Sequence, residues 1–212
     1  SYAIGDAPYA SMTDAGVYTV TATFTTASGN YVFEGEAEEL QMTAQYTVAQ
    51  ASAQISWNIE GGFEYDGEEH SYSATYRNVF GEDVGLTVTL TAGGAAYKDA
   101  GDYTFTAKFA TEDEARNYSL NEDTAERSIL VRTVSVRFGS TSFIYDGTAK
   151  RVSAELTDEV ALKDGVTVSL IYSGTPFGDR TFATGSAAPI MAGNYTATAV
   201  LGNTNGNFVL AG

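Results

Sequence analysis

The side chains of this sequence that could transfer protons or bind metal ions are almost all carboxylates. Its 212 residues include 27 Asp and Glu, a single His and no Cys. Nucleophilic hydrolysis needs a base beside the nucleophile, and the sole imidazole, His70, follows Glu68 and Glu69 in a stretch without a catalytic pattern. We therefore predict a protein that is not an enzyme, with no catalytic residues and with His70 at the surface or a strand edge.

Calcium is the one cofactor that the carboxylates suggest. The ion takes about six to eight oxygen ligands, and two neighbouring loop-like stretches of the chain are rich in acidic residues. The candidate ligands are Glu112, Asp113, Glu114, Glu122 and Asp123. No EF-hand spacing is present, and exposed loop carboxylates are ordinarily solvated, so the alternative is that no cofactor binds.

The charge balance restricts the partners. A formal net charge of −16 at pH 7 repels the phosphates of nucleic acids and of anionic lipids. No apolar run approaches the roughly 18 residues of a membrane span. We expect no nucleic-acid binding and no membrane insertion, and without Cys the cores must hold together without disulfides.

One phrase of sequence recurs three times and indicates tandem duplication. It reads DAGVYTVTATF from Asp14 to Phe24, DAGDYTFTAKF from Asp99 to Phe109, and MAGNYTATAVL from Met191 to Leu201. Two further markers keep the same order, an Asn followed by an aromatic residue (Asn30-Tyr31, Asn117-Tyr118, Asn207-Phe208) and a YDG triplet (Tyr65-Asp66-Gly67, Tyr145-Asp146-Gly147). The period of about 80 to 92 residues is longer than a solenoid unit of about 20–50 residues and suits a β-sandwich of roughly 100 residues.

The markers divide the chain into one complete repeat and two partial ones. Residues 50–131 form the complete repeat, residues 1–49 are the C-terminal part of a first repeat, and residues 132–212 are a third repeat without its last strand. An incomplete sandwich leaves an unpaired strand edge. We therefore expect residues 132–212 either to lack a strand or to share one with another copy of the chain.

Alternation within each copy of the phrase predicts a half-buried strand. In the second copy, Tyr103, Phe105, Ala107 and Phe109 face one way and the polar residues between them face the other. Further strands are expected at residues 70–76, 86–91, 150–156 and 166–172, and residues 111–118 are expected to form one helical turn at most. The fold class is therefore all-β, as tandem immunoglobulin-like sandwiches.

The phrase and the YDG triplet are both interpreted as scaffold. In immunoglobulin-like sandwiches, a Tyr near the start of a strand turns its hydroxyl back onto the backbone a few residues upstream. The structural residues of this corner are Gly16, Tyr18, Gly101, Tyr103, Gly193 and Tyr195, and Asp14 and Asp99 are expected to bond to amides of the turn itself. Asp-Gly in the triplets predicts a tight turn. The alternative, a binding loop at the corner, is weakened because Met191 replaces the Asp in the third copy.

These motifs together resemble the MBG/YDG-type bacterial immunoglobulin-like repeats. The resemblance is carried by FEYDGEEHSYSAT, FIYDGTAKRVSAEL, DAGDYTFTAKF and MAGNYTATAVL, and it covers nearly the whole chain. Such repeats occur in tandem in large secreted or wall-anchored, often adhesin-like, bacterial surface proteins. The resemblance implies an extracellular location and neighbouring repeats as partners, and it brings no ligand and no catalytic residues.

The sequence therefore predicts a non-enzymatic structural or adhesive module, a stalk or spacer of a bacterial surface protein. The alternative is a sandwich that binds a carbohydrate or a protein, such as a host or matrix protein or glycan. Sugar-stacking candidates are Tyr72, Tyr76, Phe177 and Phe182, and residues 173–189 form the longest and most variable loop-like segment. Binding tends to evolve in such loops.

Overall fold

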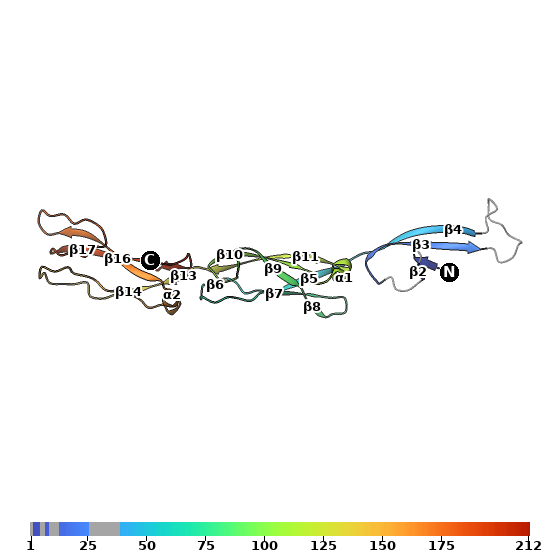
Figure 1. The fold of residues 1–212 in the computed structure, drawn as a ribbon, viewed down its shortest axis with the longest axis horizontal. Helices are drawn as coiled ribbons and strands as arrows, with labels where there is room; N and C mark the ends of the chain where they lie inside the picture. Colours follow the sequence, from blue (N-terminus) through green and yellow to red (C-terminus); the bar gives the residue numbers. More distant parts are fainter. Residues whose placement is uncertain (1, 5–6, 9–12, 26–38) are drawn as a thin grey trace. The chain divides into compact units, whose positions relative to one another are not determined.

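The computed structural model describes residues 2–4, 7–8, 13–25 and 39–212, and these residues form an all-β protein with two short helices (Figure 1). The Asn30-Tyr31 copy of the second marker lies outside the described residues. The described chain divides into two compact units, both of which take segments of the middle repeat. Unit 1 consists of Ser1–Asn58, Tyr72–Thr89 and Thr106–Ala125, and unit 2 of Ile59–Ser71, Leu90–Phe105 and Glu126–Gly212. The predicted boundaries of the repeats as domains stay a prediction.

Unit 1 contains two four-stranded sheets. The first has the order β2-β1-β3-β4 and is formed by β1 (Tyr2–Ile4), β2 (Ala7–Pro8), β3 (Gly16–Thr25) and β4 (Glu39–Val48). The second has the order β11-β5-β7-β8 and is formed by β5 (Ala51–Asn58), β7 (Ser73–Arg77), β8 (Asp83–Gly85) and β11 (Tyr118–Asn121). In the second sheet β11 runs parallel to β5, whereas the other strand pairings described in unit 1 are antiparallel.

The helix of unit 1, α1 (Glu112–Asn117), lies where one helical turn at most was expected, and its six residues exceed one turn. Thr111 and Glu114 form a capping box at its start, in which each side chain accepts a hydrogen bond from the backbone N–H of the other residue. Beside it, Tyr76 is 2% exposed and packs edge-on against Phe109. Burial, and after it the nearby Glu114 carboxylate, raises the pKa of Tyr76 to about 12.

Three strands pass from one unit into the other along the chain. They are β9 (Thr87–Ala92), β10 (Gly101–Lys108) and β12 (Thr124–Leu130), and with β6 (Phe63–Glu64) they form a sheet of order β6-β12-β10-β9. The strand β10 contains the second copy of the recurring phrase, and its alternation is as predicted. Tyr103, Phe105 and Ala107 are each no more than 1% exposed.

Unit 2 continues with three two-stranded sheets and a second helix. The elements are β13 (Arg132–Val134), β14 (Val136–Phe138), β15 (Ala154–Leu156), α2 (Glu159–Lys163), β16 (Thr167–Pro176), β17 (Gly193–Gly202) and β18 (Phe208–Leu210). The pairs are β13 with β18, β14 with β15, and β16 with β17. The pair of β13 and β18 is parallel, like β5 and β11, so the first strand and the strand after the Asn-aromatic marker pair in the same way in both repeats.

The helix α2 was not foreseen. Its five residues are too short to show a helical period, but Asp158 caps it by accepting a hydrogen bond from the N–H of Ala161 at 2.9 Å. Gly165, with a φ of 72°, follows its end. A cap and a closing glycine were the signals available in the sequence.

Each corner tyrosine donates its hydroxyl proton to the carbonyl oxygen four residues upstream. The distances are 2.7 Å for Tyr18 to Asp14, 2.6 Å for Tyr103 to Asp99 and 3.1 Å for Tyr195 to Met191. The three copies of the phrase therefore share this hydrogen bond, including the copy in which Met replaces Asp.

We predict that Tyr103→Phe lowers the local free energy of opening of β10 by about 0.5–1.5 kcal/mol, because the partly buried hydrogen bond to the Asp99 carbonyl is lost. Amide hydrogen exchange of β10 measures this change. Tyr145→Phe serves as the control, since Tyr145 is 62% exposed and its loss should leave exchange almost unchanged. Equal effects of the two substitutions would contradict the assignment of the hydrogen bond as stabilising.

Candidate functional site

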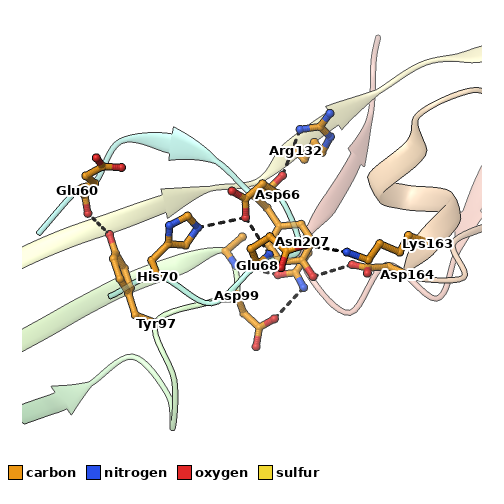
Figure 2. Close-up of polar contacts among 12 residues, drawn as sticks. Glu60, Asp66, Glu68, His70, Tyr97, Asp99, Arg132, Lys163, Asp164 and Asn207 are labelled. Atoms are coloured by element: carbon orange, nitrogen blue, oxygen red, sulfur yellow. Dashed lines mark hydrogen bonds and ion pairs between the residues drawn. The ribbon is translucent and has the colours of Figure 1, made fainter. Parts of the chain in front are cut away.

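A group of polar side chains in unit 2 joins the middle repeat to the third repeat (Figure 2). The middle repeat contributes the YDG turn after β6 and the corner before β10. The third repeat contributes β13, α2 and the turn before β18. We call this group the second junction.

Tyr65 of the YDG turn lies at the centre of the second junction. It is 3% exposed, its hydroxyl donates to Asp164 Oδ2 at 2.6 Å, and its ring meets Phe208 edge-on with the centroids 5.3 Å apart. Burial and the Asp164 carboxylate raise the pKa of Tyr65 above its ordinary value. The first YDG triplet thus supplies a contact to the next repeat in addition to a turn.

Arg132, the first residue of β13, holds the carboxylate of Asp158 with two arms of its guanidinium. Nε lies 2.9 Å and Nη2 also 2.9 Å from Oδ2. The other guanidinium nitrogen donates to the carbonyl of Tyr65 at 3.3 Å. Because Asp158 also caps α2, one half-buried carboxylate positions the helix and the arginine together.

Asn207 of the third repeat contacts the corner before β10 in the second junction. It is 4% exposed, its Nδ2 donates to Asp99 Oδ1 at 3.0 Å, and its Oδ1 accepts from the N–H of Ala100 at 2.8 Å (Figure 2). The carboxylate of Asp99 was expected to bond to amides of its own turn. The structure instead places it against the asparagine of the following repeat.

His70 lies beside the YDG turn and is partly exposed. Its ring packs on Phe63 with the centroids 4.4 Å apart, its side chain is 21% exposed, and Nε2 lies 3.1 Å from Asp66 Oδ1. Burial alone would raise the pKa of Asp66, but hydrogen bonds from the Glu68 N–H and from His70 outweigh it and lower that pKa. His70 is thus partly at the surface and also supports the turn through its contact with Asp66.

The second YDG triplet makes the same local turn. Asp146 accepts from the N–H of Thr148 at 2.9 Å, as Asp66 does from Glu68. The Lys150 ammonium, together with Thr148, holds the pKa of Asp146 well below its usual range. Tyr145 is 62% exposed, compared with 3% for Tyr65.

The five predicted calcium ligands serve other contacts or lie apart. Glu112, Asp113 and Glu114 form the first turn of α1, where Glu114 caps the helix and Asp113 pairs with Arg116 at 3.2 Å. Glu122 and Asp123 follow β11. Among residues 2–4, 7–8, 13–25 and 39–212, no three His, Cys, Asp or Glu side chains gather as metal ligands would.

Of the predicted sugar-stacking residues, Tyr76 is buried, Phe177 is exposed, and Tyr72 and Phe182 are partly exposed. Tyr76 is buried, which rules it out as an exposed platform, and Phe182 packs edge-on against Tyr195 at 5.1 Å. Phe177 is 65% exposed and lines a cavity of about 350 Å³ in the third repeat, together with Phe138, Phe143 and Tyr145.

The cavity adjoins the place where the third repeat differs most from the middle one. In the middle repeat, β12 lies between β6 and β10. In residues 132–212, all of which the structure describes, Phe143-Ile144 is not a strand and β17 pairs with β16 alone. Ile144 is 90% exposed as a result. Completion by another copy of the chain stays a prediction.

Comparisons of the chain with protein-family models, with curated proteins and with solved structures find no match. In the part of the chain that the structure describes, neither helix has the length and apolar character to cross a membrane.

We predict that Arg132→Ala lowers the free energy of opening at β13 and β18 by about 1–3 kcal/mol, because the half-buried Asp158 loses its charged partner. Amide hydrogen exchange of these strands measures the change. Lys163→Ala is the matched control, since Lys163 and Glu68 pair at 2.7 Å but are 67% and 66% exposed, and solvent weakens such pairs. An equal loss in both variants would show that burial of the Arg132 pair does not matter.

The raised pKa of Tyr65 predicts an alkaline effect on stability. A phenol that stays protonated in the folded chain ionises in the unfolded chain near its ordinary pKa of about 10. The unfolded state then binds fewer protons, so the free energy of unfolding falls as the pH rises from about 10 toward the folded pKa. Urea titrations followed by circular dichroism should show a smaller fall for Tyr65→Phe than for the wild type. Parallel curves for the two proteins would contradict the raised pKa.

Proposed function

We propose that the chain is a non-enzymatic structural or adhesive module of a bacterial cell-surface protein, built from tandem immunoglobulin-like repeats of the MBG/YDG type. The observation that carries the proposal is that residues of the recurring motifs form contacts between repeats. Tyr65, Asp99 and Asn207 contact the neighbouring repeat, so motifs present in more than one copy serve to connect repeats.

The sheet pairings and the charge support the same proposal. The parallel pairing of the first strand with the strand after the Asn-aromatic marker occurs in two repeats, which fits a duplicated sandwich. A net charge of −16 favours solubility of an exposed extracellular segment. The partners proposed are therefore the adjoining repeats first, and a host or matrix component second.

A second candidate function is binding of a carbohydrate or a protein. The observation that favours it is the cavity of about 350 Å³ with its exposed aromatic side chains Phe177, Phe143 and Tyr145. Exposed aromatic rings beside a cavity suit stacking against a sugar. A glycan-array signal that Phe177→Ala abolishes would favour this function over that of a spacer.

The spacer function predicts that the chain holds an attached tag at a fixed height. The full chain is placed between a bacterial surface anchor and a fluorescent tag, and the height of the tag above the cell envelope is measured by super-resolution microscopy. A flexible Gly/Ser linker of equal length is the control, because its end-to-end distance grows only with the square root of residue number. We expect a greater and narrower height distribution for the chain, and the same distribution as the linker would refute the proposal.

A further inference from the structure

We propose that the Asp-Ala pair at the start of the corner is a recognition site for the side-chain carboxamide of an asparagine in the following repeat. The aspartate supplies an acceptor and the alanine N–H supplies a donor. The partner that fits is a neighbouring repeat with Asn in the Asn-aromatic marker. This inference goes beyond the proposed spacer function, because the contact between the two repeats does not depend on where the protein is located or what it binds.

The same two hydrogen bonds occur at two separate junctions. At the second junction they are those of Asn207 with Asp99 and Ala100, described above. In unit 1, where the first repeat meets the middle one, Asn117 Nδ2 donates to Asp14 Oδ1 at 2.9 Å, and the N–H of Ala15 donates to Asn117 Oδ1 at 2.6 Å. The partners at the two junctions are 103 and 108 residues apart in sequence, so each asparagine reaches its aspartate across a similar length of chain.

The chemistry of the pair specifies a carboxamide. An ionised carboxylate only accepts hydrogen bonds, and a backbone N–H only donates. A group that satisfies both must present a donor and an acceptor side by side, as Asn does. A carboxylate in the place of the Asn207 carboxamide would satisfy the Ala100 N–H but would face Asp99 with a like charge.

Two different local structures deliver the asparagine to this position. Asn117 is the last residue of α1, and its Nδ2 also donates to the carbonyl of Asp113 at 3.1 Å. Asn207 instead follows a tight turn in which Asn203, Asn205 and Gly206 all have positive φ. A helix end and a turn thus place the same side chain on the same pair of groups. The two hydrogen bonds therefore depend on the asparagine and not on one particular loop conformation.

The corner that accepts the asparagine is held in place by hydrogen bonds within its own repeat. Tyr18 and Tyr103 donate to the backbone carbonyls of Asp14 and Asp99. The tyrosine of a repeat therefore holds the backbone of this aspartate, while the carboxylate of the same residue holds the next repeat. Such pre-positioning reduces the entropy lost when the two repeats join.

The third corner shows what the aspartate adds. Met191 stands in its place, and Tyr195 still donates to the Met191 carbonyl. A thioether is a weak acceptor, so an asparagine presented there would gain the bond from the Ala192 N–H without a strong acceptor for its own N–H. The residue at this position thus distinguishes corners that recognise an asparagine from corners that do not.

The test is a charge swap in the full chain. In Asn207→Asp, two carboxylates face each other, and the Ala100 amide should exchange its hydrogen about tenfold faster, as expected for loss of a charge-assisted hydrogen bond. In the double variant Asp99→Asn with Asn207→Asp, the carboxamide introduced at position 99 donates to the carboxylate introduced at position 207. That carboxylate also accepts from the Ala100 N–H, so exchange should return close to the wild-type rate. Asn194→Asp, an exposed change in the third repeat, controls for the added negative charge alone.

A second readout reports whether the pairing orients the repeats. Since the chain has no Cys, Glu126→Cys and Thr198→Cys provide two sites for spin labels, one in each repeat, and both side chains are exposed. We expect the distance distribution to broaden in Asn207→Asp and to narrow again in the charge swap. Unchanged exchange and width in Asn207→Asp, or failure of the swap to restore either, would overturn the proposal. The swap also separates loss of recognition from misfolding, since a misfolded Asn207→Asp chain would not be rescued at Asp99.

Discussion

The hydrogen bond from each corner tyrosine to the carbonyl four residues upstream is the constraint on which the other features depend. It fixes the turn that leads into the central strand and aligns the inward side chains of β10. It also requires space beside the ring. A Cβ on Gly93, whose φ is 107°, would collide with the carbonyl oxygen of Asp102, and one on Gly174 would collide with that of Asn194. Glycine just after β9, and within β16, lets the tyrosine pack against the backbone.

The local features of the fold could be read from the sequence because residues close in the chain determine them. Alternation along Tyr103, Phe105 and Ala107 indicated the buried strand, and the Asp-Gly dipeptides indicated turns in which Asp66 and Asp146 accept from nearby amides. Contacts between repeats were not accessible in this way. The residues next to Tyr65 in sequence do not indicate that its hydroxyl bonds to Asp164, which is 99 residues away.

The corner residues Asp14 and Asp99 show why the contacts between repeats were not predicted from the sequence. Asp at a turn normally bonds to its own loop, and that rule predicted local bonds for Asp14 and Asp99. The rule considers one loop in isolation. In a tandem array, the same carboxylate can reach an amide that another repeat presents, and the recurrence of Asn117 and Asn207 was the only sign of it in the sequence.

Three of the eleven Lys and Arg residues of this acidic chain form ion pairs where repeats meet. Where the first repeat meets the middle one, Arg116 Nη1 lies 3.5 Å from Asp14 Oδ2. At the second junction Arg132 pairs with Asp158, and Lys163 pairs with Glu68. A chain with 27 acidic and 11 basic residues repels itself. Positive charge at the junctions reduces that repulsion where acidic turns come closest, and burial of the Arg132 pair strengthens it relative to the exposed Lys163 pair.

The helix α1 and the turn before β18 differ in length and shape, yet both end at an asparagine followed by a strand parallel to the first strand of its repeat. The strand anchors the asparagine, so the residues ahead of it are free to change in number. Insertions and deletions can therefore accumulate in these loops during evolution without moving the joint. The length of the segment ahead of the asparagine can therefore differ between the two junctions while the two hydrogen bonds of the asparagine stay the same.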